Sequence, residues 1–248
     1  MVASNLHRLL LGGGGLVLTF HRVSDDLPED GLTRSSRNFE RFCRFFRTNF
    51  DVVSLSEIVN RLERREALAG AIAITFDDGY LDNYEVAAPI LQSLGLPATF
   101  FVVTQYMGSD TVAWWDRDLP RQPGWMTWDQ VRELSRAGFD IGAHTRTHVD
   151  LGKVNGTAAR EEIAGARADL VARLGRAPEH FAYPYGQRDH MLDANRELVR
   201  EAGFRSCVSC YGGVATCGAD PFSLRRIPVA RWYRTPEQFT FEQLARRW

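Results

Sequence analysis

Two short polar clusters carry the residue types that water-activating metal centres use. Asp77 and Asp78 follow one apolar run directly, and His144 and His148 stand four residues apart after another. Neutral imidazoles with a carboxylate suit a catalytic zinc-like ion that keeps an open position, while a second carboxylate can take a proton from its water. Each cluster alone has a structural explanation, because Asp often caps a helix and surface histidines meet this spacing by chance. Together the clusters predict a metal-dependent hydrolytic centre.

Two further features of the backbone bear on this centre. Imidazoles four residues apart converge on one ion if segment 144–148 makes a helical turn. A third segment, Tyr183-Pro184-Tyr185-Gly186, also follows an apolar run. Its Pro and Gly predict a turn whose backbone N–H groups point into the site as oxyanion donors.

A scaffold that brings several strand ends to one edge would position these clusters. Short apolar runs alternate with amphipathic helical stretches, the pattern of repeated βα units around a parallel sheet. In such folds ligands bind at the carboxyl ends of the strands. Seven strands are predicted, at residues 16–20, 71–76, 98–103, 139–141, 181–183, 204–208 and 224–229. The predicted fold class is therefore α/β, as a barrel or an open sheet.

Three helices have clear signals at their ends. The first helix, which follows the second predicted strand, carries an apolar stripe and ends at Gly95. The third helix ends at Gly175. The second opens with a capping box at Thr127 and runs to Gly138. Residues 109–124, rich in Gly, Pro and Asp, are predicted to form a long loop over one face.

Length and composition indicate an ordinary globular chain. Its 248 residues contain no linker or repeat, so one domain over residues 1–248 is expected. Thirty Lys and Arg against 31 Asp and Glu leave no basic excess for nucleic acid. No apolar run is long enough for membrane insertion, and the N-terminus shows no export signal, so a cytoplasmic location is expected.

The four cysteines are interpreted as unligated thiols. The sequence does not indicate an oligomeric state.

The three motifs, in this order and spacing, resemble those of the polysaccharide deacetylases, also called the NodB homology domain or carbohydrate esterase family 4. The matching residues are Thr75-Phe76-Asp77-Asp78-Gly79, His144 with His148, and Phe181 with Pro184-Tyr185-Gly186. The resemblance spans residues 16–230. It implies a deformed (β/α) barrel of about seven parallel strands that removes N-acetyl groups from an acetylated amino sugar and releases acetate.

The resemblance also implies roles for individual residues. Asp78, His144 and His148 would be the metal ligands, and Asp77 would be the general base. The backbone amide of Tyr185 would join the metal in holding the oxyanion. One divalent ion is implied, with zinc as the first expectation and cobalt, nickel, iron or manganese as alternatives.

The chain departs from the family's commoner pattern at two places. The acid that protonates the departing amine is usually a histidine near the C-terminus, but no histidine follows His190 here. The departure resembles a branch in which a histidine on an N-terminal strand takes this role, which makes His21 the candidate. Ala182 occupies the position of an arginine that pairs with the base, and Arg226 on the last strand is the candidate substitute.

The remaining histidines and tryptophans have weaker patterns. His7, His180 and His190 are interpreted as surface or structural residues. At least one of four tryptophans in or after the long loop is expected in a substrate groove, because indole faces stack on sugar rings. These tryptophans are Trp114, Trp115, Trp125 and Trp128.

Two alternative functions stay open at this point. The same centre could serve a related amidohydrolase or O-acetyl esterase with a non-sugar or non-polymeric substrate. A catalytically inactive sugar-binding module could also keep the barrel. A cytoplasmic deacetylase would meet a lipid-linked or nucleotide-linked acetamido sugar more readily than a finished wall polymer.

Overall fold

A computed structural model describes residues 13–245, and its central feature is a nearly closed parallel barrel. The strand order around the barrel is β10-β1-β5-β6-β7-β8-β9. The strands are β1 (Leu16–Phe20), β5 (Ala71–Phe76), β6 (Thr99–Val102), β7 (Asp140–Ala143), β8 (His180–Ala182), β9 (Ser206–Val208) and β10 (Arg226–Pro228). All seven predicted strands and the α/β barrel are therefore confirmed.

The barrel closes weakly between its last two strands. A single parallel bridge joins Val208 to Leu224, where the Ser209 N–H donates to the Leu224 carbonyl over 2.9 Å. Three two-residue strands were not predicted: β4 (Asp51–Val52) on the start of β5, and the pair β2 (Arg22–Val23) and β3 (Thr33–Arg34). The β2–β3 pair follows His21 directly and helps to hold the chain beyond β1.

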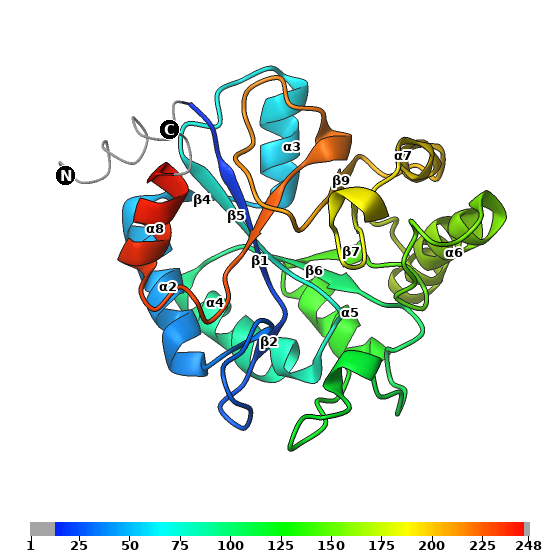
Figure 1. Cartoon of the computed structure of the whole chain (residues 1–248), viewed down its shortest axis with the longest axis horizontal. Helices are drawn as coiled ribbons and strands as arrows, with labels where there is room; N and C mark the ends of the chain where they lie inside the picture. The colour runs from blue at the N-terminus through cyan, green and yellow to red at the C-terminus, as the bar shows by residue number, and fades with distance from the viewer. Residues whose placement is uncertain (1–12, 246–248) are drawn as a thin grey trace.

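Helices surround the barrel (Figure 1). They are α2 (Ser36–Asn49), α3 (Leu55–Glu63), α4 (Ala88–Leu94), α5 (Trp128–Arg136), α6 (Gly156–Leu174), α7 (Asp193–Glu201) and α8 (Pro236–Ala245). Left-handed glycines end α4 at Gly95 and α6 at Gly175, and a reciprocal capping box between Thr127 and Gln130 opens α5, as predicted. Within residues 13–245, none of the helices combines the length and the apolar character that a membrane crossing requires.

Short helical turns complete the description. The π-helical turn η1 (Asn83–Ala87) precedes α4, and the 3₁₀ turn η2 (Trp114–Asp116) lies within the predicted long loop. The turns η3 (Arg188–His190) and η4 (Pro221–Ser223) follow β8 and β9.

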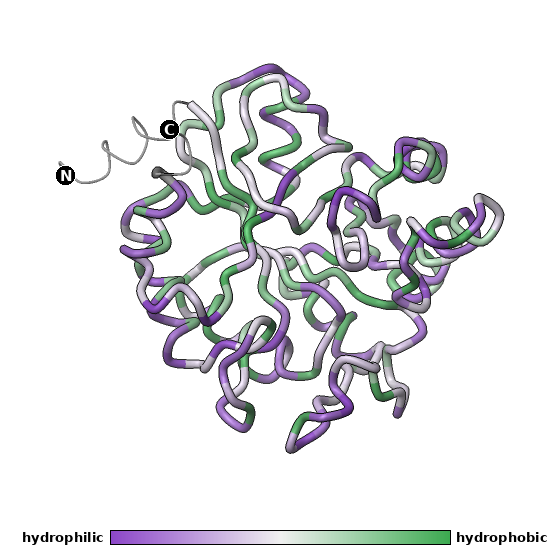
Figure 2. The backbone as a smooth tube through the Cα atoms, viewed as in Figure 1, coloured by the Kyte–Doolittle hydropathy of each residue, from purple (hydrophilic) through white to green (hydrophobic). Residues whose placement is uncertain are grey.

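Apolar strands fill the middle of the molecule (Figure 2). In β5 the residues Ile72, Ile74 and Phe76 pack in the cluster under the helices, whereas Ala71 and Ala73 pack in a second cluster with Val17 and Phe101 from neighbouring strands. This separation follows the strand period of two residues. Both faces of the sheet are buried, which explains the nearly continuous apolar runs in the sequence.

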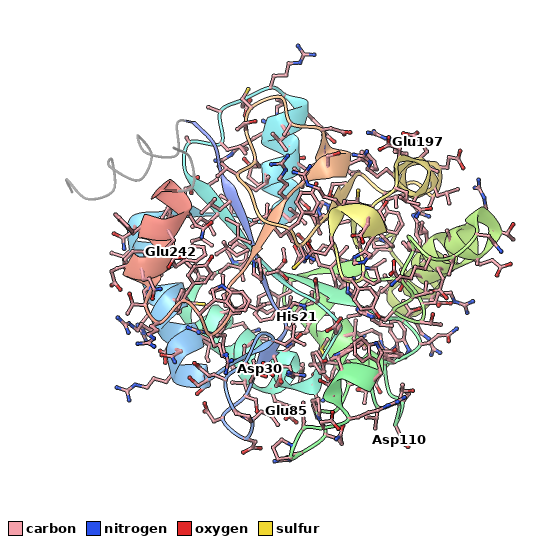
Figure 3. All side chains as sticks on the ribbon, viewed as in Figure 1. His21, Asp30, Glu85, Asp110, Glu197 and Glu242 are labelled. Carbon is pink, nitrogen blue, oxygen red and sulfur yellow. The ribbon has the colours of Figure 1, made fainter. Side chains whose placement is uncertain are left out.

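One end of the barrel carries the polar residues. Thr75 and Arg226 are buried, and the Arg226 guanidinium lies over the Phe101 ring, 5.4 Å from its centre. Figure 3 shows His21 near the middle of the molecule, whereas Glu85, Asp110, Glu197 and Glu242 lie at its periphery. The functional clusters predicted from the sequence meet at this end.

Candidate active site

The side chains of Asp77 and Asp78, which directly follow β5, point in different directions. Asp77 lies two residues after Thr75 and continues the alternation that points side chains into the barrel. Asp78 has a left-handed backbone with φ 74°, which turns its carboxylate toward β7. Gly79 has φ 86°, and a Cβ there would lie 2.6 Å from the Met107 methyl carbon. The left-handed backbone and this close approach both favour glycine where the chain passes from the strand to the next helix.

The backbone conformation that brings His144 and His148 together was not indicated by the sequence. Segment 144–148 is not a helical turn, so that condition was wrong. Thr145 and His148 have left-handed backbones with φ 62° and 60°, and the Thr145 hydroxyl accepts the His148 N–H over 3.0 Å. His144 Nδ1–H donates to the Ala182 carbonyl over 2.8 Å, which leaves its Nε2 lone pair facing Asp78.

Asp78, His144 and His148 place three ligand atoms around one point. Asp78 Oδ1 lies 3.3 Å from Nε2 of each histidine, and all three residues are buried. Two ligands bound at about 2.1 Å in tetrahedral geometry are about 3.4 Å apart, so this spacing fits a shared ion. Asp78 Oδ1 is buried without a hydrogen-bond partner, which is costly for a carboxylate unless a cation binds it. The residues fit a divalent metal.

Asp77 has a different partner, the guanidinium of Arg226. Two hydrogen bonds of 2.6 Å each join Arg226 Nη1 and Nη2 to the two carboxylate oxygens. Arg226 also donates to the Thr75 hydroxyl over 3.0 Å and to the Ser209 carbonyl over 2.6 Å, and it is fully buried. Burial alone would raise the pKa of Asp77, but the arginine charge holds that pKa below its ordinary value.

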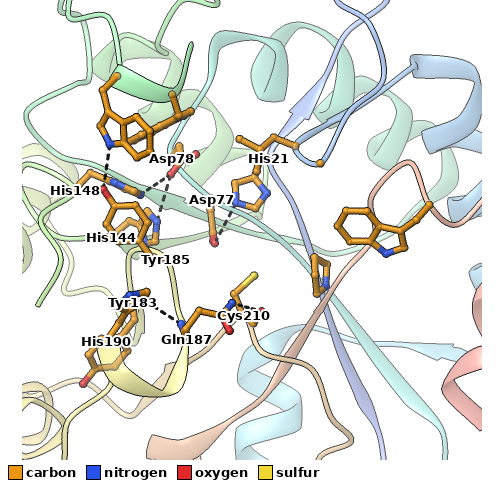
Figure 4. Close-up of a pocket in the computed structure, with 16 residues that line it drawn as sticks. His21, Asp77, Asp78, His144, His148, Tyr183, Tyr185, Gln187, His190 and Cys210 are labelled. Atoms are coloured by element: carbon orange, nitrogen blue, oxygen red, sulfur yellow. Dashed lines mark hydrogen bonds and ion pairs between the residues drawn. The ribbon is translucent and has the colours of Figure 1, made fainter. Parts of the chain in front are cut away.

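His21 stands directly after β1, next to Asp77 (Figure 4). Its Nε2 lies 4.0 Å from Asp77 Oδ2, and its side chain is 15% exposed. Burial lowers the pKa of His21, although the charges of Asp78 and Asp77 oppose the change. The imidazole is therefore neutral near pH 7 and lies on the same side of the site as Asp77.

The Tyr183-Pro184-Tyr185-Gly186 segment forms a tight turn. Tyr185 and Gly186 have left-handed backbones with φ 62° and 61°, and the Gly186 N–H donates to the Pro184 carbonyl over 2.7 Å. Among the described residues, the Tyr185 amide has no acceptor, so it is available to a ligand. The Tyr185 ring packs against His148, with 5.0 Å between ring centres. Its role as an oxyanion donor stays a prediction.

Trp115 anchors the long loop against the candidate metal ligands. Its ring centre lies 4.4 Å from that of His148, and its indole N–H donates to the Tyr80 hydroxyl over 2.7 Å. The Tyr80 hydroxyl in turn donates to Asp116 over 2.7 Å, and Asp116 is paired with the buried Arg22. This network fixes Trp115 beside His148, whose Nδ1 has no hydrogen-bond partner.

One cavity of about 470 Å³, a size typical of small-molecule sites, is lined by His21, Asp77, Asp78, Trp115, His144, His148 and Tyr185. Trp114, 61% exposed, and Trp232, 50% exposed, line it from two different loops. Trp114 donates a hydrogen bond to Tyr185 after β8, whereas Trp232 follows β10 and lies near Gly31. The cavity therefore offers two exposed aromatic surfaces.

The sequence interpretation missed some of the lining residues. Trp114 and Trp115 line the cavity as expected, whereas Trp125 stacks on Tyr80 and Trp128 packs under Arg173. His190 also lines the cavity, which the interpretation as a surface or structural residue did not anticipate. Gln187 and Trp232 were likewise not singled out, and Cys210 was interpreted only as an unligated thiol. They lie on loops, where no periodic pattern indicates which way a side chain faces.

His180 and three of the four cysteines lie away from the cavity. His180 is buried at the start of β8 and bonds to Ser56 and Ser206 over 2.8 Å each, which is a structural role. The cysteines are free thiols, of which Cys43 and Cys207 are buried. His7 lies outside the described residues.

The family of the chain follows from its sequence match. Residues 64–207 match the family model described as "Polysaccharide deacetylase". Because the match covers more than half of the 248 residues, the chain belongs to the polysaccharide deacetylase family. The predicted family and class of enzyme are confirmed.

Individual relatives are more distant. The chain is 28% identical over 144 residues to Poly-beta-1,6-N-acetyl-D-glucosamine N-deacetylase of Escherichia coli (strain K12), which covers 53% of this chain but only 20% of that protein. The structure of IcaB from Ammonifex degensii has a TM-score of 0.76 at 25% identity and covers 93% of this chain and 97% of that one. Streptococcus pyogenes deacetylase PplD has a TM-score of 0.79 at 22% identity, with 93% and 98% covered, and shows the same fold.

Proposed function

We propose that this chain is a metal-dependent N-deacetylase that hydrolyses the acetamido group of a residue within an acetylated amino-sugar chain. The observation that carries the proposal is the separate pairing of two adjacent carboxylates. Asp78 faces two histidine nitrogens at 3.3 Å, whereas Asp77 is held by Arg226 at 2.6 Å. One carboxylate can therefore bind a metal while its neighbour moves a proton.

Asp78, His144 and His148 would hold one divalent ion, with zinc as the first expectation. Such an ion would polarise the acetyl carbonyl and lower the pKa of a water molecule in the cavity. The His144 ring keeps its orientation through its bond to the Ala182 carbonyl, and His148 through its contacts with Trp115 and Tyr185. The ligand set is thus largely preformed.

Asp77 acts as the general base. It takes a proton from the attacking water as the water oxygen bonds to the acetyl carbon and the carbonyl electron pair moves to oxygen. Its lowered pKa keeps it ionised near neutral pH. The Tyr185 N–H, which has no acceptor among the described residues, stabilises the resulting oxyanion.

His21 acts as the general acid. When the electron pair returns from the oxyanion, the C–N bond breaks, its electrons go to nitrogen, and nitrogen takes a proton from His21 Nε2. His21 is neutral at rest because burial lowers its pKa, so it first takes up the proton that Asp77 removed from water and then donates it as an imidazolium when the C–N bond breaks. The carboxyl group of the acetic acid still carries the second proton of the water and passes it to the amine, so acetate and an ammonium group leave and the protons balance.

The substrate class is supported by the cavity and by the relatives. Exposed indole rings of Trp114 and Trp232 suit stacking on sugar rings. The named activity of the E. coli relative makes a poly-N-acetylglucosamine oligosaccharide the first substrate to test. The test is acetate release from such oligosaccharides by protein reconstituted with zinc; no release above that of EDTA-treated protein would reject the proposal.

A further inference from the structure

Two residues that the proposed reaction does not use contact the backbone around His21. We propose that Asn83, with Asp82, is a positioning residue that holds residues 21–23 so that the His21 imidazole stays beside Asp77. This inference rests on the proposed role of His21 as general acid.

The contacts form a small clamp. Asn83 Nδ2 donates to the His21 carbonyl over 2.6 Å and to Asp82 Oδ1 over 2.8 Å. Asp82 Oδ1 also accepts the Val23 N–H over 3.1 Å. The two side chains thus hold the peptide groups on both sides of Arg22.

The clamp holds the His21 carbonyl, whereas the β2–β3 pair holds the chain just beyond it, where the Arg22 N–H donates to the Leu32 carbonyl over 2.9 Å. β1 ends at Phe20, whose carbonyl accepts the last ladder bond from Asp77 N–H over 3.0 Å. Among the described residues, the His21 side chain makes no hydrogen bond, and its closest charged partner is Asp77 at 4.0 Å. Its orientation is therefore set through its backbone, and Asn83 is the side chain that holds the His21 carbonyl.

Asn83 makes these contacts from a buried position. It is fully buried, and its Oδ1 has no hydrogen-bond partner, so its amide serves as a donor. It also begins the π-helical turn η1, an irregularity that often occurs at functional sites. Because Asp82 and Asn83 follow Asp77 and Asp78 closely, one segment carries the base, a metal ligand and the clamp.

The chemistry of the leaving group gives a test of positioning. In an acetamide the C–N bond breaks with its electron pair on nitrogen, which must take the proton from His21. In a nitrophenyl acetate the C–O bond breaks and the phenolate leaves without a proton. Damage to the acid therefore lowers amide hydrolysis selectively, whereas damage to the metal site, the base or the fold lowers hydrolysis of both substrates.

The experiment compares kcat/KM for an N-acetylglucosamine oligosaccharide and for nitrophenyl acetate in zinc-loaded variants. H21Q is expected to lower amide hydrolysis by about 100-fold and ester hydrolysis by less than about threefold. N83A, and N83D as a second variant of nearly the same shape, are expected to lower amide hydrolysis by about tenfold with the same selectivity. The double variant H21Q/N83A should lose no more than H21Q, since both changes act through one group.

Asn195 supplies a matched control. It is also buried, and its Nδ2 donates to the Leu151 carbonyl over 2.7 Å. N195A should cost stability in thermal melting without changing the amide-to-ester ratio.

The outcomes separate the inference from the function on which it rests. If H21Q changes the ratio but N83A and N83D do not, the clamp is rejected and the acid stays. If H21Q leaves the ratio unchanged, His21 is not the acid, and the clamp proposal is overturned with it. If wild-type protein hydrolyses only the ester, the proposed N-deacetylase function itself fails.

Discussion

The guanidinium of Arg226 bonds to both carboxylate oxygens of Asp77 over 2.6 Å each. The arginine comes from β10 and the aspartate follows β5, with β1 between these strands in the barrel. Since both side chains are buried, the pair fixes the charge and the direction of the proposed base before any substrate binds.

Replacing Arg226 is expected to impair the proposed base. Arg226→Ala should lower kcat/KM for acetamide hydrolysis by about 100-fold. It should also move the acidic limb of the pH profile to higher pH, because the arginine holds the pKa of Asp77 down and burial alone raises it. Removing one partner of a buried pair costs about 3–5 kcal/mol of stability, so Arg226→Lys is measured in parallel.

Arg225 is the control for this prediction. It is exposed, packs on Tyr211 and has no contact with Asp77. Arg225→Ala should therefore leave the pH profile in place. An Arg226→Ala enzyme with unchanged activity and an unchanged profile would remove Arg226 from the account.

Trp115 is expected to support metal binding through His148. Their ring centres lie 4.4 Å apart, and His148 Nδ1 has no hydrogen bond to fix the ring. Trp115→Ala should weaken zinc affinity by about tenfold in competition with a chromophoric chelator. The neighbouring Trp114→Ala should leave zinc affinity unchanged, and equal affinities in both variants would show that Trp115 does not orient the ligand.

Trp114 and Trp232 are expected to bind sugar rings. Loss of one stacking contact of about 0.5–1.5 kcal/mol corresponds to a rise in KM of roughly three- to tenfold for an oligosaccharide. KM for nitrophenyl acetate should not change in either alanine variant. Phe241, 72% exposed on α8, does not line the cavity and serves as a control. The same rise in KM in Phe241→Ala would argue against specific stacking.

His180 is expected to make the fold sensitive to acid. Burial lowers its pKa to about 4 in the folded protein, against about 6.5 when unfolded. Between pH 6.5 and pH 4, His180 binds a proton in the unfolded chain but stays neutral in the folded chain. His180 should thus lower the free energy of unfolding as the pH falls from 6.5 to 4, by up to about 3 kcal/mol.

Urea unfolding at several pH values tests this effect. His180→Gln should be less stable at pH 7.5, because it loses bonds to Ser56 and Ser206. It should also lose much of the stability difference between pH 6.5 and pH 4. A variant that keeps the full pH dependence of the wild type would assign that dependence to other groups.

The sequence predicted the framework of the site because that framework follows from local patterns. Each of the seven strands is an apolar run, and the differences from the structure at their ends are small. Asp77, Asp78, His144 and His148 each follow such a run. Parallel strands then bring the two clusters to one end of the barrel.

Contacts between distant segments were harder to predict. No pattern indicates that Thr145 and His148 adopt left-handed backbones, since residues other than glycine rarely do. The clamp of Asn83 on His21 joins residues 62 positions apart and also leaves no local signal. Arg226 was suggested only by the missing arginine at position 182, and its two bonds to Asp77 become visible only in the folded chain.

The central claim is that Asp77 and Asp78, although adjacent, have separate roles. The most direct test measures bound zinc and acetate release in Asp77→Asn and Asp78→Asn, two substitutions of the same size one position apart. Asp77→Asn should keep about one zinc per chain while acetate release falls by about 100-fold or more. Asp78→Asn should lose both zinc and activity. An active Asp77→Asn enzyme, or an Asp78→Asn protein that binds zinc as tightly as the wild type, would contradict the account.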